Sequence, residues 1–173
     1  PMNVKVIEKD LMDPLAEINN VKVDLNNIPY DFEHVTLLDN TKPGADVVLE
    51  FVEENLGSRK FNWVKKPAGA PATIKQLEMA AESEIVFLAL GDCGSCSSWV
   101  ILDAIRLEKM GIPTVSICSD KFLPFAHELA KSHGAEKLNI LSVEHPIAGL
   151  SKEEIVKKTL EILPSLRYIL QIP

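Results

Sequence analysis

The sequence has few cysteines, no excess of basic residues and no long apolar run. Its 173 residues include 3 cysteines, an odd number too small for a disulfide framework. The 18 Lys+Arg against 25 Asp+Glu give a formal net charge of −7, which argues against binding to the phosphates of a nucleic acid. The longest apolar run, residues 85–90, is far shorter than the roughly 18–20 apolar residues of a membrane span. We therefore expect neither a nucleic-acid nor a membrane partner.

Targeting signals are also lacking. Residues 1–13 alternate apolar and charged side chains and contain no apolar core of a secretory signal. The expected location is therefore the cytoplasm, where thiols stay reduced unless they serve redox chemistry or bind metal. The length and the 46% hydrophobic content are those of an ordinary globular protein.

Short apolar runs alternate with amphipathic stretches from residue 35 onward. The apolar runs predict strands at residues 35–38, 61–64, 85–90, 113–118 and 138–143. The amphipathic stretches predict helices at about residues 45–56, 74–81, 99–110, 123–132 and 151–163. Strand–helix alternation of this kind indicates a doubly wound α/β fold with a mostly parallel five-stranded sheet. The flavodoxin-like strand order 2-1-3-4-5 is expected, and a Rossmann-like order is the alternative.

The first 34 residues do not follow this alternation. Residues 4–8 and 21–25 look like two extra strands. We interpret residues 1–34 as an N-terminal arm or edge hairpin, with a floppy extension as the alternative. Residues 35–173 then form a single α/β domain.

The expected fold places ligands beyond the carboxyl ends of the strands, at the point where the strand order reverses. In the flavodoxin-like order, the loops after the first and third strands line this crevice. The second of these loops, expected at residues 91–98, contains Cys93 and Cys96. Cys118 ends the fourth strand and Asp120 follows it, whereas His145 follows the fifth strand; all three are expected at the same edge of the sheet.

Cys93 and Cys96 form a Cys-x-x-Cys motif that opens a helix. Unpaired N–H groups at a helix start stabilise a thiolate, and such cysteines have pKa values of roughly 3.5–7.5. Cysteines three residues apart on a helical turn also fall within the roughly 4.4–6.8 Å Cα separation of a disulfide. Gly94 lets the backbone turn and a substrate approach closely. The hydroxyls of Ser95, Ser97 and Ser98 are candidates for capping the helix or binding an anion.

Each candidate has a structural alternative. The two motif cysteines could merely pack a tight turn, and Cys118 could be a core residue. His145 either shapes a turn or belongs to the site. Asn40 and Lys42 lie on the other wall of the crevice, where Lys42 is either an ordinary loop lysine or a residue that binds a carboxylate. Asp103 and Glu108 lie on the helix after the motif, either as a solvated face or as residues that orient the loop. No cofactor is expected, since zinc and iron–sulfur sites need about four ligands; a metal at Cys93, Cys96 and Cys118 is a minor alternative.

The motif and its surroundings resemble one protein family. The stretch Gly-Asp-Cys-Gly-Ser-Cys-Ser-Ser-Trp at residues 91–99 is similar to the signature of the UGSC family of (seleno)proteins. The similarity extends over about residues 35–155, with matching features at residues 38–43, Asp103, Glu108, residues 111–115, Phe122 and residues 145–150. A more distant resemblance is to the substrate-binding selenoprotein components of glycine and betaine reductases. Ser119 departs from the pattern, because threonine is commoner at its position.

The resemblance implies a thiol-based reaction. Family members carry selenocysteine or cysteine at the first motif position, which implies Cys93 as the reactive residue and Cys96 as its partner. The leading hypothesis is a redox enzyme in which Cys93 attacks a small molecule, Cys96 resolves the adduct and an external thiol restores the pair. The expected supporting residues are Asp92, Gly94, Ser95, Ser97, Asn40, Lys42, Cys118, Asp120 and His145.

Two other functions stay open. A hydrolase or lyase without net redox would use Cys93 as nucleophile with His145 or Asp120 as acid–base partner. A non-catalytic subunit would use the acidic surface and the N-terminal arm as an interface. A homo- or hetero-oligomer is expected in all three cases.

Overall fold

The computed structural model describes residues 21–173. Its elements are β1 (His34–Asp39), α1 (Ala45–Asn55), β2 (Lys60–Lys65), α2 (Ile74–Ala80), β3 (Ile85–Gly91), α3 (Gly94–Lys109), β4 (Thr114–Ser119), the 3-10 turn η1 (Asp120–Phe122), α4 (Leu123–Ser132), β5 (Ile140–Val143), α5 (Lys152–Thr159), the 3-10 turn η2 (Leu160–Ile162) and α6 (Leu163–Leu170). The strand expected at residues 4–8 lies outside the described residues.

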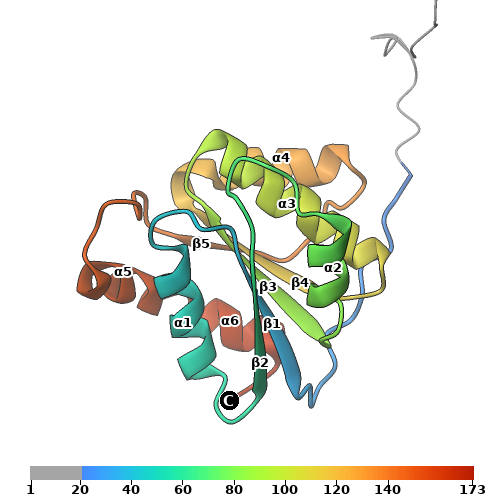
Figure 1. Cartoon of the computed structure of the whole chain (residues 1–173), viewed down its shortest axis with the longest axis horizontal. Coiled ribbons are helices and arrows are strands. Elements are labelled where there is room, and N and C mark those ends of the chain that lie inside the picture. Colours follow the sequence, from blue (N-terminus) through green and yellow to red (C-terminus); the bar gives the residue numbers. More distant parts are fainter. Residues whose placement is uncertain (1–20) are drawn as a thin grey trace, which may run out of the picture.

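The five strands form one parallel sheet in the order β2-β1-β3-β4-β5. This is the flavodoxin-like order, so the expected doubly wound α/β fold is confirmed and the Rossmann-like alternative is wrong. The order reverses between β1 and β3 (Figure 1). The loops after these two strands therefore flank the switch point, where such folds bind ligands.

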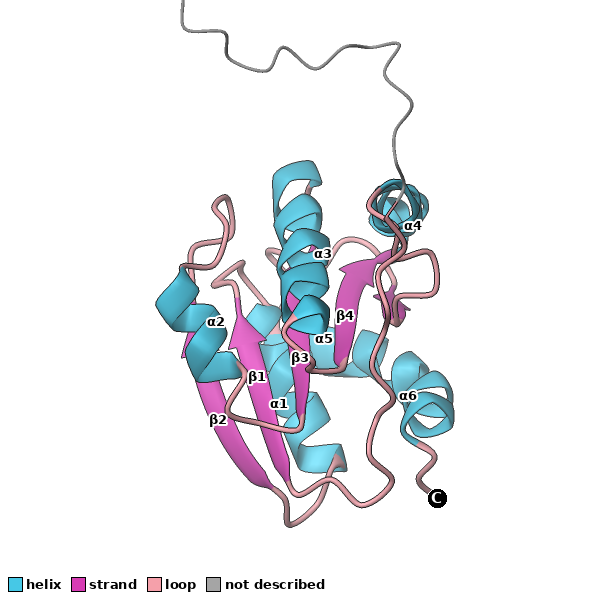
Figure 2. Ribbon diagram, turned by 90° about the vertical axis from the view of Figure 1, so that its right-hand side faces the viewer, coloured by secondary structure: helices cyan, strands magenta, loops and turns pink. Residues whose placement is uncertain are grey.

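Helices cover both faces of the sheet. Figures 1 and 2 show α1, α5 and α6 on one face and α2, α3 and α4 on the other. Successive residues of β3 alternate between the two cores: Phe87 packs with the α1 side, whereas Val86 and Leu88 pack with the α3 side. Every residue of β3 is buried, as its uninterrupted apolar run predicts for a strand covered on both faces.

Two helix boundaries differ from the expectation. Helix α3 begins at Gly94 rather than near Trp99, because the Cys93 side chain caps it directly and leaves no long loop. The helix expected at about residues 151–163 ends at Thr159, and the chain continues through η2 into α6. Pro164 lies in the first turn of α6, a position where its missing N–H costs nothing.

The strand expected at residues 21–25 is not present. Residues 21–25 have no regular secondary structure, and among the described residues their backbone pairing is limited to the Val23 N–H, which donates to Gly134 O at 2.9 Å. Asn26, the residue after this segment, donates both its backbone N–H and its side-chain amide to the Glu108 carboxylate at 2.8 Å. The segment is therefore fastened by a buried glutamate of α3 instead of by a neighbouring strand.

Within residues 21–173, none of the helices combines the length and the apolar character needed to cross a membrane.

Candidate functional site

Cys93 and Cys96 lie together at the start of α3. Cys93 is the N-cap residue, and its Sγ accepts the Cys96 N–H at 3.3 Å. The structure pairs the two residues as a disulfide with Cα atoms 5.4 Å apart. Cys93 is half-buried whereas Cys96 is fully buried. A solvent-borne molecule therefore reaches Cys93 more readily than Cys96.

The motif serines have different environments. The Ser97 hydroxyl is buried and donates to Cys93 O at 2.6 Å, and the Ser98 hydroxyl donates to Gly94 O at 2.9 Å. Both hydroxyl protons are therefore used in hydrogen bonds to backbone carbonyls and are not available to bind an anion. Ser95 is exposed with its Oγ 3.7 Å from Cys93 Sγ, so it is the motif serine that remains available to a ligand.

Gly91, at the end of β3, is required by close packing. A Cβ atom there would lie 2.6 Å from Cys118 Sγ and 2.8 Å from Ser97 Oγ. Gly94 is different, because a Cβ atom there would meet nothing within 4 Å and its backbone has no left-handed φ. The turn therefore does not need a glycine at residue 94, and the space beside it is open.

Cys118 is a core residue. It is fully buried in β4, and burial raises the pKa of its thiol to about 12 despite a backbone hydrogen bond at Gly91. A thiol with this pKa stays protonated near neutrality and is a poor nucleophile. The structure therefore favours the packing interpretation of Cys118 over a direct part in substrate binding.

Asp92 and His145 are joined at the carboxyl edge of the sheet. Asp92 Oδ1 lies 2.9 Å from His145 Nδ1, and Oδ2 accepts the N–H groups of Ile147 and Ala148 at 3.2 and 2.8 Å. Burial alone would raise the pKa of Asp92. Hydrogen bonds from Ala148, Ser119 and Ile147, together with the neighbouring His145, outweigh burial and lower this pKa. Asp92 is therefore a carboxylate at neutral pH.

Three further residues orient the His145 ring and its backbone. Ser119 Oγ lies 3.0 Å from His145 Nδ1, and the His145 N–H donates to Asp120 Oδ1 at 2.9 Å. The Phe122 ring meets the imidazole edge-to-face with centroids 5.6 Å apart. Ser119 was not among the predicted site residues; its signals were its place after Cys118 at the end of a strand and its departure from the family pattern.

Asn40 and Lys42 form the other wall of the switch point. The Asn40 amide donates to Leu90 O and accepts the Leu90 N–H, both at 2.9 Å, so it fastens the end of β1 to the end of β3. Asn40 is buried and its side chain is committed to this bridge. The Lys42 side chain is half-buried, and among the described residues its ammonium has no hydrogen bond or ion pair.

Asp103 and Glu108 are buried, so the expectation of a solvated helix face is wrong. Asp103 binds Lys66 Nζ at 3.1 Å and Arg106 Nη1 at 3.0 Å, and it accepts the Ala72 N–H. Glu108 accepts the N–H groups of Asn26 and Thr114, each at 2.8 Å. Both carboxylates fasten neighbouring segments to α3 and therefore support the helix that carries the cysteines.

The described residues contain no group of three or more His, Cys, Asp or Glu side chains arranged to hold a metal ion. The donor set proposed for a metal also includes Cys118, whose thiol is buried and protonated. These residues give the metal alternative no support.

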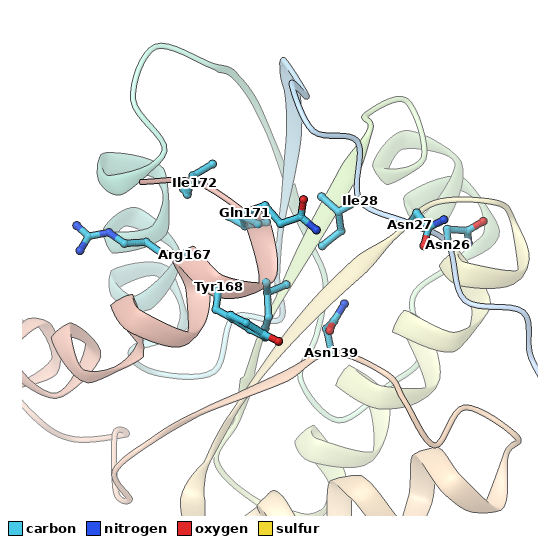
Figure 3. A pocket seen from close by; sticks show the side chains of 10 residues that line it. Asn26, Asn27, Ile28, Asn139, Arg167, Tyr168, Gln171 and Ile172 are labelled. Carbon is cyan, nitrogen blue, oxygen red and sulfur yellow. The ribbon is translucent and has the colours of Figure 1, made fainter.

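One hollow among the described residues lies away from the cysteine loop. It encloses about 720 Å³ between the segment at residues 26–28, Asn139 and the end of α6, as Figure 3 shows. Asn139 precedes β5 and Ile28 precedes β1, so this hollow opens at the amino end of the sheet. Among the described residues, neither a cysteine nor a histidine lines it.

Comparison with known proteins identifies the family of this chain. The UGSC family model matches residues 10–172, so the chain belongs to the UGSC family. No curated protein matches the chain.

Two solved structures are weakly similar to this chain. A short-chain flavodoxin associated with a PDU bacterial microcompartment is 9% identical, with a TM-score of 0.40 over 76% of this chain and 96% of that chain. A short-chain dehydrogenase/reductase from Veillonella parvula in complex with NADP is 12% identical, with a TM-score of 0.39 over 78% of this chain and 88% of that chain. Similarities this low say nothing about the ligand of this chain.

Proposed function

We propose that this protein is a thiol-dependent oxidoreductase that uses Cys93 as nucleophile and Cys96 as resolving thiol on a small molecule. The observation that carries the proposal is the arrangement of the pair: the accessible Cys93 caps α3, and the buried Cys96 lies one helical turn away within disulfide distance. The helix start stabilises the attacking thiolate, and the burial of Cys96 reserves it for the second step.

The electrons balance in two steps. The Cys93 thiolate attacks an oxidised substrate X–Y, forms an S–X bond and releases Y⁻ with the electrons of the broken bond. The Cys96 thiolate then attacks Cys93 Sγ, forms the disulfide and releases X⁻, so that the substrate gains two electrons and takes up two protons. An external thiol reductant reduces the Cys93–Cys96 disulfide by exchange and restores the dithiol.

The test uses the reduced protein and a small disulfide, without added reductant. The wild-type protein should release two equivalents of thiol per chain and end with a Cys93–Cys96 bridge in the mass spectrum. The Cys96→Ser variant should release one equivalent and keep one adduct on Cys93, because nothing resolves it. The Cys118→Ser variant is the matched control and should behave as wild type, since its thiol is buried. Two released equivalents from Cys96→Ser would contradict the proposal.

A hydrolase or lyase without net redox is the second candidate. The pairing of Asp92 with His145 favours it, because a carboxylate-held imidazole is also the acid–base partner of nucleophilic cysteines. In that case Cys96→Ser would retain full steady-state activity on the substrate.

A further inference from the structure

We propose that His145 donates the proton to the leaving group of the Cys93 reaction, that Asp92 positions it, and that the substrate is a disulfide of alkyl thiols. This inference rests on the proposed function and assigns the proton transfer in its first step. The observation that carries it is the hydrogen-bond network that holds the His145 ring beside the residue preceding Cys93.

The network fixes which ring nitrogen carries a proton. Asp92 is a carboxylate and can only accept hydrogen bonds, so the nitrogen 2.9 Å from it, Nδ1, must carry a proton. Nε2 is then the nitrogen that gains and loses a proton. The His145 side chain is 26% exposed whereas Asp92 is 2% exposed. The buried edge of the ring is therefore the Nδ1 edge, and Nε2 is available to a bound molecule.

The position of the ring suits a group leaving from Cys93. Asp92 is the chain neighbour of Cys93, and Ser119, which also meets Nδ1, bonds to the Gly91 carbonyl at 3.3 Å. Two contacts therefore hold His145 to residues 91–93, one made directly by Asp92 and one made through Ser119. A Cβ atom at Gly94 would meet nothing within 4 Å, so the residue after Cys93 leaves room for a small molecule.

Charged groups surround the ring from three elements. Asp92 follows β3, Asp120 lies in η1 beside the His145 N–H, and Lys158 of α5 bonds to the Pro146 carbonyl at 3.0 Å. Glu144 pairs loosely with Lys158 at 3.9 Å. Lys121 lies over the Phe122 ring, 5.9 Å from its centroid. Only Asp92 contacts the ring nitrogens directly among these groups, so it is the positioning residue.

The need for an acid identifies the substrate class. In the first step the Cys93 thiolate forms a bond to one sulfur of R–S–S–R, and the other sulfur leaves as RS⁻. An alkyl thiolate is basic and leaves slowly unless it is protonated, whereas an aromatic thiolate has a low pKa and leaves readily without help. His145, protonated on both ring nitrogens, gives its Nε2 proton to RS⁻; RSH leaves and the ring stays neutral with its proton on Nδ1. The proton that the Cys96 thiol loses when it attacks Cys93 Sγ goes to the second RS⁻, which leaves as RSH, and an external dithiol then reduces the enzyme disulfide.

The experiment compares the single-turnover rates of the reduced protein with an alkyl and an aromatic disulfide. His145→Asn places an amide at the position of Nδ1 and keeps the bond to Asp92, but it removes Nε2. It should lower the ratio of alkyl to aromatic rates by about 100-fold or more, the usual range for a general acid. Asp92→Asn should lower the same ratio of alkyl to aromatic rates by a smaller factor than His145→Asn does. His127→Asn, on an exposed histidine of α4, is the control and should leave both rates as in wild type.

Other outcomes are decisive against the inference. A His145→Asn variant with the wild-type ratio would show that the ring has only a structural role. Nitrogen NMR of the wild-type ring provides a second measurement that needs no variant: in the neutral ring the proton must lie on Nδ1, and a neutral ring with its proton on Nε2 would overturn the inference. Wild-type protein that reacts with neither disulfide would overturn the proposed function and this inference with it.

Discussion

At the scale of single residues, Gly91 shows how tightly the site is built into the core. A methyl group at this position would contact Cys118 Sγ and Ser97 Oγ at less than 3.0 Å. We predict that Gly91→Ala lowers the free energy of unfolding by about 1–3 kcal/mol through overpacking. Gly94→Ala is the matched control and should change stability little, because its side chain points into open space. Urea unfolding of both variants measures this, and equal stabilities would contradict the packing argument.

Asp92 makes a pH-dependent contribution to stability. Its pKa in the folded protein is below the ordinary value of 3.8, so the carboxylate stabilises the fold fully above that value. This contribution is lost as the pH falls through the lowered pKa of the folded state. We predict that wild type exceeds Asp92→Asn in unfolding free energy by a constant amount above about pH 5, and that the difference shrinks in more acidic solution. A difference that grows as the pH falls would have the wrong sign for this network.

At the scale of elements, α3 is held in place by a buried ion pair. Lys66 and Asp103 are 2% and 1% exposed and lie 3.1 Å apart, so removal of one partner leaves a buried charge. We predict that Asp103→Leu costs about 3–5 kcal/mol of stability. Lys66→Met combined with Asp103→Leu should recover part of this loss, which a double-mutant cycle with thermal or urea unfolding would measure. If the stability lost by the double variant equalled the sum of the losses of the two single variants, the two side chains would not be coupled.

The positions of strands and helices were largely predictable from the sequence, but some boundaries were not. Apolar runs such as residues 85–90 are diagnostic because a strand covered on both faces needs no polar residue. The start of α3 was misplaced because a cysteine acts as its cap, in a role that usually falls to Ser, Thr, Asp or Asn. Residues 21–25 alternate like a strand, but no neighbouring strand within residues 21–173 pairs with them. The chain is fastened one residue later, where Asn26 donates to the carboxylate of Glu108, 82 residues away in the sequence.

At the scale of the whole molecule, the strand order explains why residues distant in sequence meet. The carboxyl ends of β1, β3, β4 and β5 lie along one edge, and this brings the cysteine loop near Ser119 and His145. The sequence could predict this edge and the candidates along it. It could not assign their contacts. Asn40 bridges two strand ends by hydrogen bonds and Cys118 packs in the core, whereas Asp92 and His145, 53 residues apart, form a pair. Such pairings depend on loop geometry that no local pattern encodes.

The central claim is that Cys93 is a reactive thiolate at the start of α3, and its alkylation rate tests this most directly. The reduced protein is treated with iodoacetamide at pH 6, and labelled peptides are quantified by mass spectrometry over time. We predict that Cys93 reacts faster than free cysteine under the same conditions, that Cys96 lags behind it, and that buried Cys118 is labelled only after unfolding. Alkylation of Cys93 no faster than that of free cysteine would contradict the account.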